Sequence, residues 1–432
     1  MIEQLKFNHP PRRHLTRRNT LLTSLIGRDS NLERSCWSHT LKRQILWPSI
    51  PFLLLFIGDV RLPIYGSTIT IPLGMFLIFP ASLLLLARAK LLPCRPAALI
   101  VGVLAFGVLG SALTPLSQAT RVAAGSLPLV FVAVTLFVYA QYRISYDQAV
   151  KFMFIGGIFL SIAVIVLALI SLGTEGGYYE QKLVIETPLG RSNYLTAFLI
   201  FLVALSIPRS AWLTALFSVS VACTMSRGGM FMLLLLFIAV PLAHRRKLWW
   251  IGIGGLAAFL AIAYIAATGA VDVIEWFIEP GDERLDSTIN RMLLWALGID
   301  LWSSNPIFGI GPNTFRTFVE SADGLEDVWG VHNSVLLMIL NYGIAGLFLY
   351  GCYLRIVYRS ILDAERVDGR FTHIRAVFAV LLIFSLFEPL IGSAAFEILL
   401  ALTYILSKSA LHPVQLTQRP QHNNTFLSPP EQ

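Results

Sequence analysis

The chain has 432 residues, of which 56% are hydrophobic and only 13% are charged. Soluble domains are roughly half apolar and a quarter charged, and no soluble core could hide this much apolar surface. The composition therefore excludes an ordinary soluble protein. The net charge of +8 would suggest nucleic-acid binding in a soluble protein, but here its distribution along the chain has another explanation, and we expect no nucleic-acid partner.

Long runs with almost no charge predict membrane-spanning helices. A helix needs about 20 residues to cross a bilayer, and backbone groups in lipid must be satisfied within the segment. In chain order the predicted spans are residues 45–58, 64–87, 97–113, 122–141, 152–172, 194–208, 211–223, 229–243, 248–268, 332–354, 376–392 and 394–410. We therefore expect an all-α, polytopic membrane helical bundle of about 12 transmembrane helices, formed by residues 45–411.

The basic residues predict the orientation of this bundle. Most of the 33 Lys and Arg residues fall in segments on the same side as the amino terminus, including Arg12, Arg13, the run Arg245 to Lys247 and the stretch Arg355 to Arg375. Cytoplasmic loops carry such an excess of positive charge. The polar tails, residues 1–44 and 412–432, are expected to be cytosolic and disordered, and the basic first tail can lie against anionic membrane lipids.

The opposite face carries two substantial loops, at about 173–193 and about 268–331. The longer loop has eleven acidic residues against three arginines, so it is expected to be a large extracytoplasmic loop rather than another span. Between Leu285 and Trp302 its apolar residues recur at helical spacing, which predicts a helix lying along the interface. Asn305 and Pro306 should end this helix, and the glycines of NPIFGIGPNTF indicate a tight turn.

Four polar residues stand at this outer boundary, where a charge beside a hydrophobic span needs a reason. They are Arg191, Arg227, Arg291 and His332. A snorkelling arginine or a capping histidine would explain any one of them alone. Three arginines together with a histidine favour an anion site.

The residue types suggest transfer chemistry at a diphosphate. Guanidinium groups are permanently charged and bind phosphate oxygens in pairs, and Gly228 and Gly229 would let backbone amides approach an anion. His332 opens a helix, where the positive end of the helix dipole helps to keep the imidazole a base. An acceptor hydroxyl would lose its proton to His332 as it attacks an activated carbon, while the arginines stabilise the departing phosphate.

We expect neither a metal nor a cofactor. The sequence has no phosphate-binding P-loop and no acidic D-x-D pair, and its four cysteines lie far apart without zinc-ligand spacing. A nucleotide-linked donor in the cytosol is therefore disfavoured, and a lipid-linked donor that enters sideways from the bilayer suits the topology better.

The segments TMSRGGMFMLLL, RMLLWALGIDLWSSNPIFGIGPNTF and HNSVLLMILNYGIAGLFLY resemble, in order and spacing, the conserved block of the O-antigen ligase and Wzy polymerase superfamily of bacterial membrane glycosyltransferases. The resemblance covers roughly residues 191–350. It implies functional positions at Arg227, Arg291 and His332, with Arg191 as a fourth. The supporting positions in the matching motifs are Ser226, Gly228, Trp295 and Asn333. Asn341 departs from the family, because many relatives carry glutamate there.

The resemblance also implies that a glycan moves from an undecaprenyl-diphosphate carrier to an acceptor hydroxyl on the periplasmic face of the bacterial inner membrane. Lipid A core as acceptor would make the protein an O-antigen ligase, whereas a second lipid-linked glycan would make it a polymerase of O-antigen or exopolysaccharide. A transporter or flippase that only binds an anionic lipid-linked glycan is an alternative of another class, and a structural subunit of an export complex is a third. Tryptophans of the long loop could stack on sugars or anchor in the interface.

Overall fold

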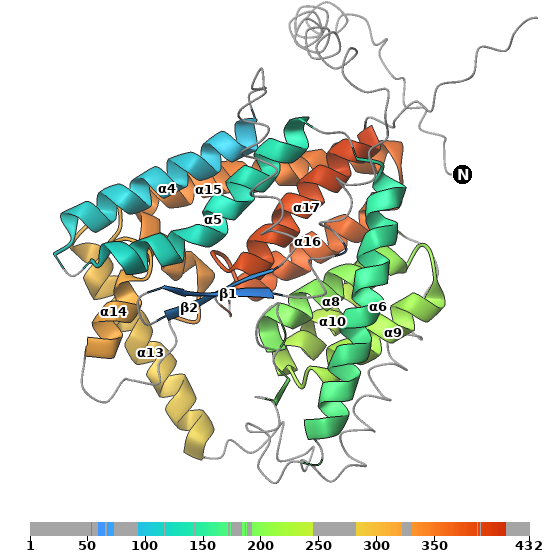
Figure 1. Cartoon of the computed structure of the whole chain (residues 1–432), viewed down its shortest axis with the longest axis horizontal. Coiled ribbons are helices and arrows are strands. Elements are labelled where there is room, and N and C mark those ends of the chain that lie inside the picture. Colours follow the sequence, from blue (N-terminus) through green and yellow to red (C-terminus); the bar gives the residue numbers. More distant parts are fainter. Residues whose placement is uncertain are drawn as a thin grey trace, which may run out of the picture. The chain divides into compact units, whose positions relative to one another are not determined.

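A computed structural model describes residues 53, 59–64, 67–72, 94–115, 117–141, 144–171, 173, 184–185, 187, 192–244, 282–321, 331–386, 388 and 390–411. Both predicted tails, the predicted span 248–268 and almost all of the span 45–58 lie outside these residues. Most predicted spans that fall inside them are helices: α4 (Arg95–Leu113), α5 (Ala119–Gln141), α6 (Tyr146–Ser171), α8 (Ser192–Ser206), α9 (Ala211–Cys223), α10 (Arg227–His244), α15 (Ser334–Val367), α16 (Phe371–Ser385) and α17 (Ala394–Leu411) (Figure 1).

Two described elements are not helical. Strands β1 (Asp59–Ile64) and β2 (Ser67–Pro72) pair antiparallel, with Ile64 opposite Ser67. The prediction of a helix from residue 64 is therefore wrong over β2. The sequence STITIP alternates threonine with isoleucine, and β-branched side chains favour a pleated strand. Apolar content outweighed this alternation in the prediction, whereas the all-helical prediction is confirmed for the other described elements.

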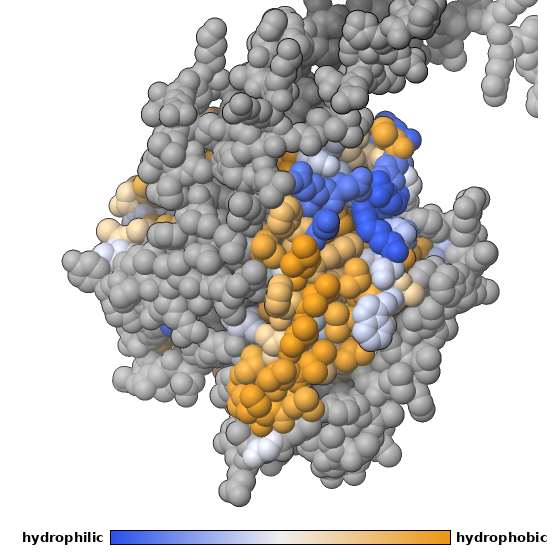
Figure 2. All heavy atoms as spheres, turned by 45° about the vertical axis from the view of Figure 1, so that its right-hand side comes forward, coloured by the Kyte–Doolittle hydropathy of each residue, from blue (hydrophilic) through white to orange (hydrophobic). Residues whose placement is uncertain are grey.

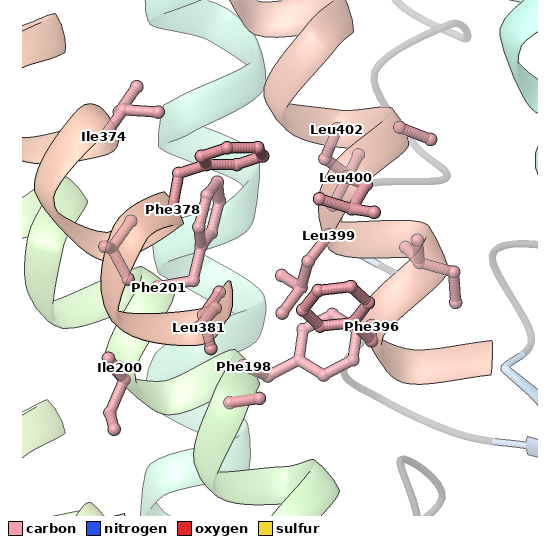
Figure 3. Close-up of a cluster of buried hydrophobic side chains, with 14 of the residues drawn as sticks. Phe198, Ile200, Phe201, Ile374, Phe378, Leu381, Phe396, Leu399, Leu400 and Leu402 are labelled. Carbon is pink, nitrogen blue, oxygen red and sulfur yellow. The ribbon is translucent and has the colours of Figure 1, made fainter. Parts of the chain in front are cut away.

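Helix α8 lies at the centre of the main hydrophobic core. Its residues 195–206 are all buried, and it packs against α6, α9, α10, α16 and α17. Figure 3 shows Phe198 of α8 beside Phe396 of α17, and Phe201 of α8 beside Phe378 of α16. A helix that is apolar all round belongs in the interior of a bundle. Because α8 contacts five other helices, its central position helps to fix where those helices lie.

The described helices also present apolar surface to their surroundings. Figure 2 shows a broad apolar area on one face, with hydrophilic residues gathered at one end. By length and composition, α4, residues 119–140 of α5, α6 and α15 could each cross a membrane, and five shorter apolar helices accompany them. Large apolar side chains on α6, such as Phe159 and Leu169, are more than half exposed. Exposed apolar area of this extent is characteristic of a lipid-facing surface.

Helix α15 is broken by a kink at Gly343, which has φ 66° and ψ −174°. The turn of residues 304–313 lies against this kink. Ile310 N–H donates to Leu340 O at 2.7 Å, and the amides of Ile344 and Ala345 donate to Pro306 O at 3.0 Å and Ile307 O at 3.2 Å. A kink leaves backbone groups without helical partners, and in an apolar bundle these must be satisfied by other protein groups. The glycine-rich turn is therefore a structural partner of the broken helix.

We expect Gly343→Ala to destabilise the protein strongly. Its positive φ is costly for a residue with a Cβ, and the added carbon would collide with the backbone carbonyl of Ile307. The expected loss is about 1–3 kcal/mol or more, seen as a lower midpoint of thermal unfolding in detergent. Gly351→Ala is the matched control on the same helix, because nothing lies within 4 Å of its added carbon. An equal change in the two variants would contradict the role of the kink.

The predicted interfacial helix is confirmed as a helix, α13 (Asp282–Ser303), which is followed by α14 (Thr314–Ser321). A second, smaller core joins α13, the turn, α14 and the first half of α15; it contains Leu294, Ile310, Phe315, Val319, Val331, Leu336 and Leu340. Part of the segment predicted as a solvated loop is thus folded onto the bundle. This packing brings α13 to the beginning of α15.

Candidate functional site

The site begins where α10 starts. Ser226 precedes Arg227, the first residue of the helix, and its hydroxyl accepts a hydrogen bond from Gly229 N–H at 3.0 Å. The same hydroxyl donates to Asn193 Oδ1, in the first turn of α8, at 2.7 Å. Ser226 therefore caps α10 and ties it to the start of α8. Arg227 is exposed at this shared end, while Arg191, which directly precedes Ser192 of α8, lies outside the described residues.

The two glycines after Arg227 are needed for close packing of α10, a role that the sequence alone did not show. A Cβ added at Gly228 would overlap the ring of Phe384 near the end of α16, and one added at Gly229 would overlap Thr196 of α8. The glycines thus let α10 approach both neighbouring helices closely. Gly228 consequently holds Arg227 next to the connection that follows α16.

The beginning of α15 is tied to that same connection. Asn333 caps the helix by accepting from Leu336 N–H at 2.9 Å, and its amide group donates to Leu386 O at 3.1 Å. Ser334 donates to the backbone carbonyl of Glu388 at 2.7 Å and accepts from Ile391 N–H at 3.0 Å. Asn333 and Ser334 therefore tie Leu386, Glu388 and Ile391 to the beginning of α15.

His332 lies immediately before this cap, with a φ of 44° in the left-handed region. Positive φ is uncommon for a residue with a side chain, and such residues concentrate at functional sites. Its side chain is 31% exposed, and Nδ1 lies 3.7 Å from Oε2 of Glu388, whose side chain is 16% exposed. The imidazole thus lies at the beginning of α15, beside an acidic side chain.

Sequence reasoning missed Glu388. It placed this residue inside a span at 376–392, but α16 ends at Ser385. Two signals could have shown this: an acidic side chain at the end of an apolar run, and Pro389 directly after it, which disfavours helix at the preceding residue.

Trp295 connects α13 to the histidine. Its indole N–H donates to the carbonyl of Val331 at 2.6 Å, one residue before His332. Arg291 lies one turn earlier in α13, and residues four apart share a helix face. The side chain of Arg291 is outside the described part of the structure. The tryptophan of the R-x-x-x-W motif is therefore a fixed contact to the His332 segment.

We expect Trp295→Phe to lower turnover about tenfold, because the ring packing is retained but the single hydrogen bond to Val331 is lost. Turnover per folded molecule would be measured in nanodiscs. Trp212→Phe is the control, since Trp212 is 75% exposed at the beginning of α9, whereas Ser226 and Arg227 follow the other end of that helix. If Trp295→Phe turned over as fast as Trp212→Phe, the hydrogen bond would have no part in placing His332.

Three helix beginnings are thus linked in a chain of contacts. Helix α8 is joined to α10 through Asn193 and Ser226, α10 packs against the end of α16 through Gly228, and α15 is joined to the connection after α16 through Asn333. Amides at helix beginnings carry partial positive charge and favour anions. No group of three His, Cys, Asp or Glu side chains that could hold a metal occurs among the described residues. The described part of the chain is therefore that of a multi-pass membrane protein in which Arg227 and His332 each lie at the beginning of a helix that is tied to the end of α16 or to the connection after it.

Residues 211–351, about a third of the chain, match the family model described as O-Antigen ligase (Wzy_C). The match confirms, over that segment, the resemblance to the O-antigen ligase and Wzy polymerase superfamily. It includes Ser226, Arg227, Arg291 and His332, whereas Asn193 and Glu388 lie outside it. A search of curated proteins finds no match.

Proposed function

We propose that this chain is an integral membrane glycosyltransferase that moves a glycan from an undecaprenyl-diphosphate carrier to an acceptor hydroxyl, as an O-antigen ligase does with lipid A core. The observation that carries the proposal is that α10, which begins with Arg227, packs against Phe384, while α15, which is preceded by His332, is bonded through Asn333 to Leu386 two residues further on. A base and a cation are both required when an alcohol displaces a diphosphate.

In the proposed step, the acceptor oxygen attacks the anomeric carbon of the glycan. The bond from that carbon to the diphosphate oxygen breaks, and the hydroxyl proton passes to His332. Arg227, Arg291 and Arg191 neutralise the charge that develops on the departing lipid diphosphate, which leaves with its bonding electron pair. In this proposal the arginines take the part that a divalent cation plays elsewhere, and the reaction occurs on the periplasmic face, where the lipid-linked donor is available.

The test is a reaction of the purified protein in nanodiscs with undecaprenyl-diphosphate oligosaccharide, alone and with lipid A core, and with products sized on gels. Product that forms only when lipid A core is present supports a ligase, and this activity should survive a chelator. A ladder from the donor alone would instead indicate a polymerase. Donor binding without turnover under either condition would overturn the enzyme proposal and leave a transporter or flippase.

A further inference from the structure

We infer that Glu388 is a positioning residue of this transfer reaction, and that it orients the imidazole of His332 so that Nε2 faces the acceptor hydroxyl. The inference rests on the proposed function. Its starting point is the placement of the two side chains: Glu388 Oε2 lies 3.7 Å from Nδ1 of His332, and no other carboxylate of the described residues forms an ion pair with that ring.

The Nδ1 nitrogen of His332 lacks a hydrogen bond to any described residue. Nδ1 of His332 is buried and makes no hydrogen bond to the described residues, although the ring as a whole is partly exposed. Buried polar atoms in proteins are normally paired. A distance of 3.7 Å is slightly too long for a hydrogen bond, and contacts of this kind in unliganded sites often shorten when substrate binds. Glu388 is therefore the group positioned to accept a proton from Nδ1–H.

The backbone that carries Glu388 is fixed on two sides. Ser334 bonds the carbonyl of Glu388 and the amide of Ile391. Further along, Glu397 of α17 accepts from Gly392 N–H at 2.9 Å and from the hydroxyl of Tyr350 at 2.7 Å. A side chain on a clamped segment can hold its partner within the narrow limits that catalysis needs. Replacing only the carboxylate leaves all of these bonds in place.

The chemical consequence concerns the two ring nitrogens. A neutral imidazole carries its proton on one nitrogen, and a carboxylate at Nδ1 holds the proton there. The lone pair is then on Nε2, which can accept the acceptor's proton, and the carboxylate stabilises the imidazolium that results. Without Glu388 the ring could turn, or could carry its proton on the wrong nitrogen.

The experiment compares Glu388→Gln, Glu388→Asp, His332→Ala and the double variant Glu388→Gln/His332→Ala in the nanodisc assay. Glu388→Gln should lower kcat about 10- to 100-fold and change KM for the lipid-linked donor by less than about twofold. Glu388→Asp should recover part of kcat. In the His332→Ala background, Glu388→Gln should have almost no further effect, since both changes remove the same function.

Glu365→Gln is the matched control, because Glu365 pairs with Arg375 at the other end of α15, at 3.0 Å. It should leave kcat unchanged. If Glu388→Gln lowered kcat as much in the His332→Ala background as alone, or left kcat intact while His332→Ala was inactive, the positioning role would be overturned. If His332→Ala itself kept full turnover, the proposed function would fail instead.

Discussion

Replacing His332 with glutamine should lower the transfer rate by about two to four orders of magnitude, because the side chain that accepts the acceptor's proton is removed. The site itself should survive the change. Asn333 and Ser334 bond the backbone of Leu386 and Glu388, and Asn333 caps α15, so none of these bonds requires the imidazole. Glutamine keeps a polar side chain of similar reach.

The measurement is single-turnover transfer in nanodiscs, together with binding of the lipid-linked donor. Donor affinity should stay within about threefold, since a base lost from the transition state leaves ground-state binding largely intact. His373→Gln serves as the control, because His373 lies at the start of α16, opposite the end that leads to the site. A His332→Gln protein that transferred glycan at the normal rate would exclude base catalysis and favour a binding-only transporter.

Arg227→Ala should lower kcat/KM by about 100- to 1000-fold, the effect of removing one preorganised group that stabilises developing charge. Arg227 begins α10, where the helix dipole adds to its own charge. Lysine should restore activity only in part, because an ammonium group cannot bind two phosphate oxygens in the planar manner of a guanidinium. The predicted order of activity is therefore arginine, lysine, alanine.

Initial rates over a range of donor concentrations would check this order. The control is Arg359→Lys, since Arg359 is exposed in the half of α15 that follows the kink. It should leave both kcat and KM unchanged. Equal activity of the lysine and alanine variants of Arg227 would show that its charge is not used, and activity equal to wild type in both would remove it from the site.

Much of the helical architecture follows from hydropathy. The span predicted at 211–223 coincides with α9, and those at 97–113 and 394–410 differ from α4 and α17 by two residues or fewer at either end. Long apolar runs in lipid have few alternatives to a helix. Hydropathy failed where a helix is indicated by the spacing of its buried residues and not by a continuous apolar run. Helix α15 continues to Val367 because Val357, Ile361 and Ala364 recur at helical spacing and are buried, although most of the residues between them are polar.

The site was partly predictable for the same kind of reason. Arg227 and His332 stand out because charged or titratable groups at a membrane boundary are costly without a function. Glu388 did not stand out, because hydropathy absorbed it into a span, and Asn193 is an ordinary polar residue in the sequence. Their placement depends on packing between α8, α10 and α16. The residues that contact each other there are more than thirty positions apart in the chain. Such contacts leave no periodic signal in a single sequence.

The length of α15 bears on the depth at which the chemistry occurs. The 34 residues of α15 would rise about 51 Å if the helix were unbroken, and the kink at Gly343 shortens it, whereas the hydrocarbon layer of a bilayer is about 30 Å thick. Its charged stretch, Arg355 to Arg366, belongs outside the hydrocarbon, so the apolar residues 334–354 are left to fill it. In the proposed arrangement, the end of α15 that follows His332 is expected at the level of the lipid phosphates. A carrier lipid could present its diphosphate there without lifting its tail out of the bilayer.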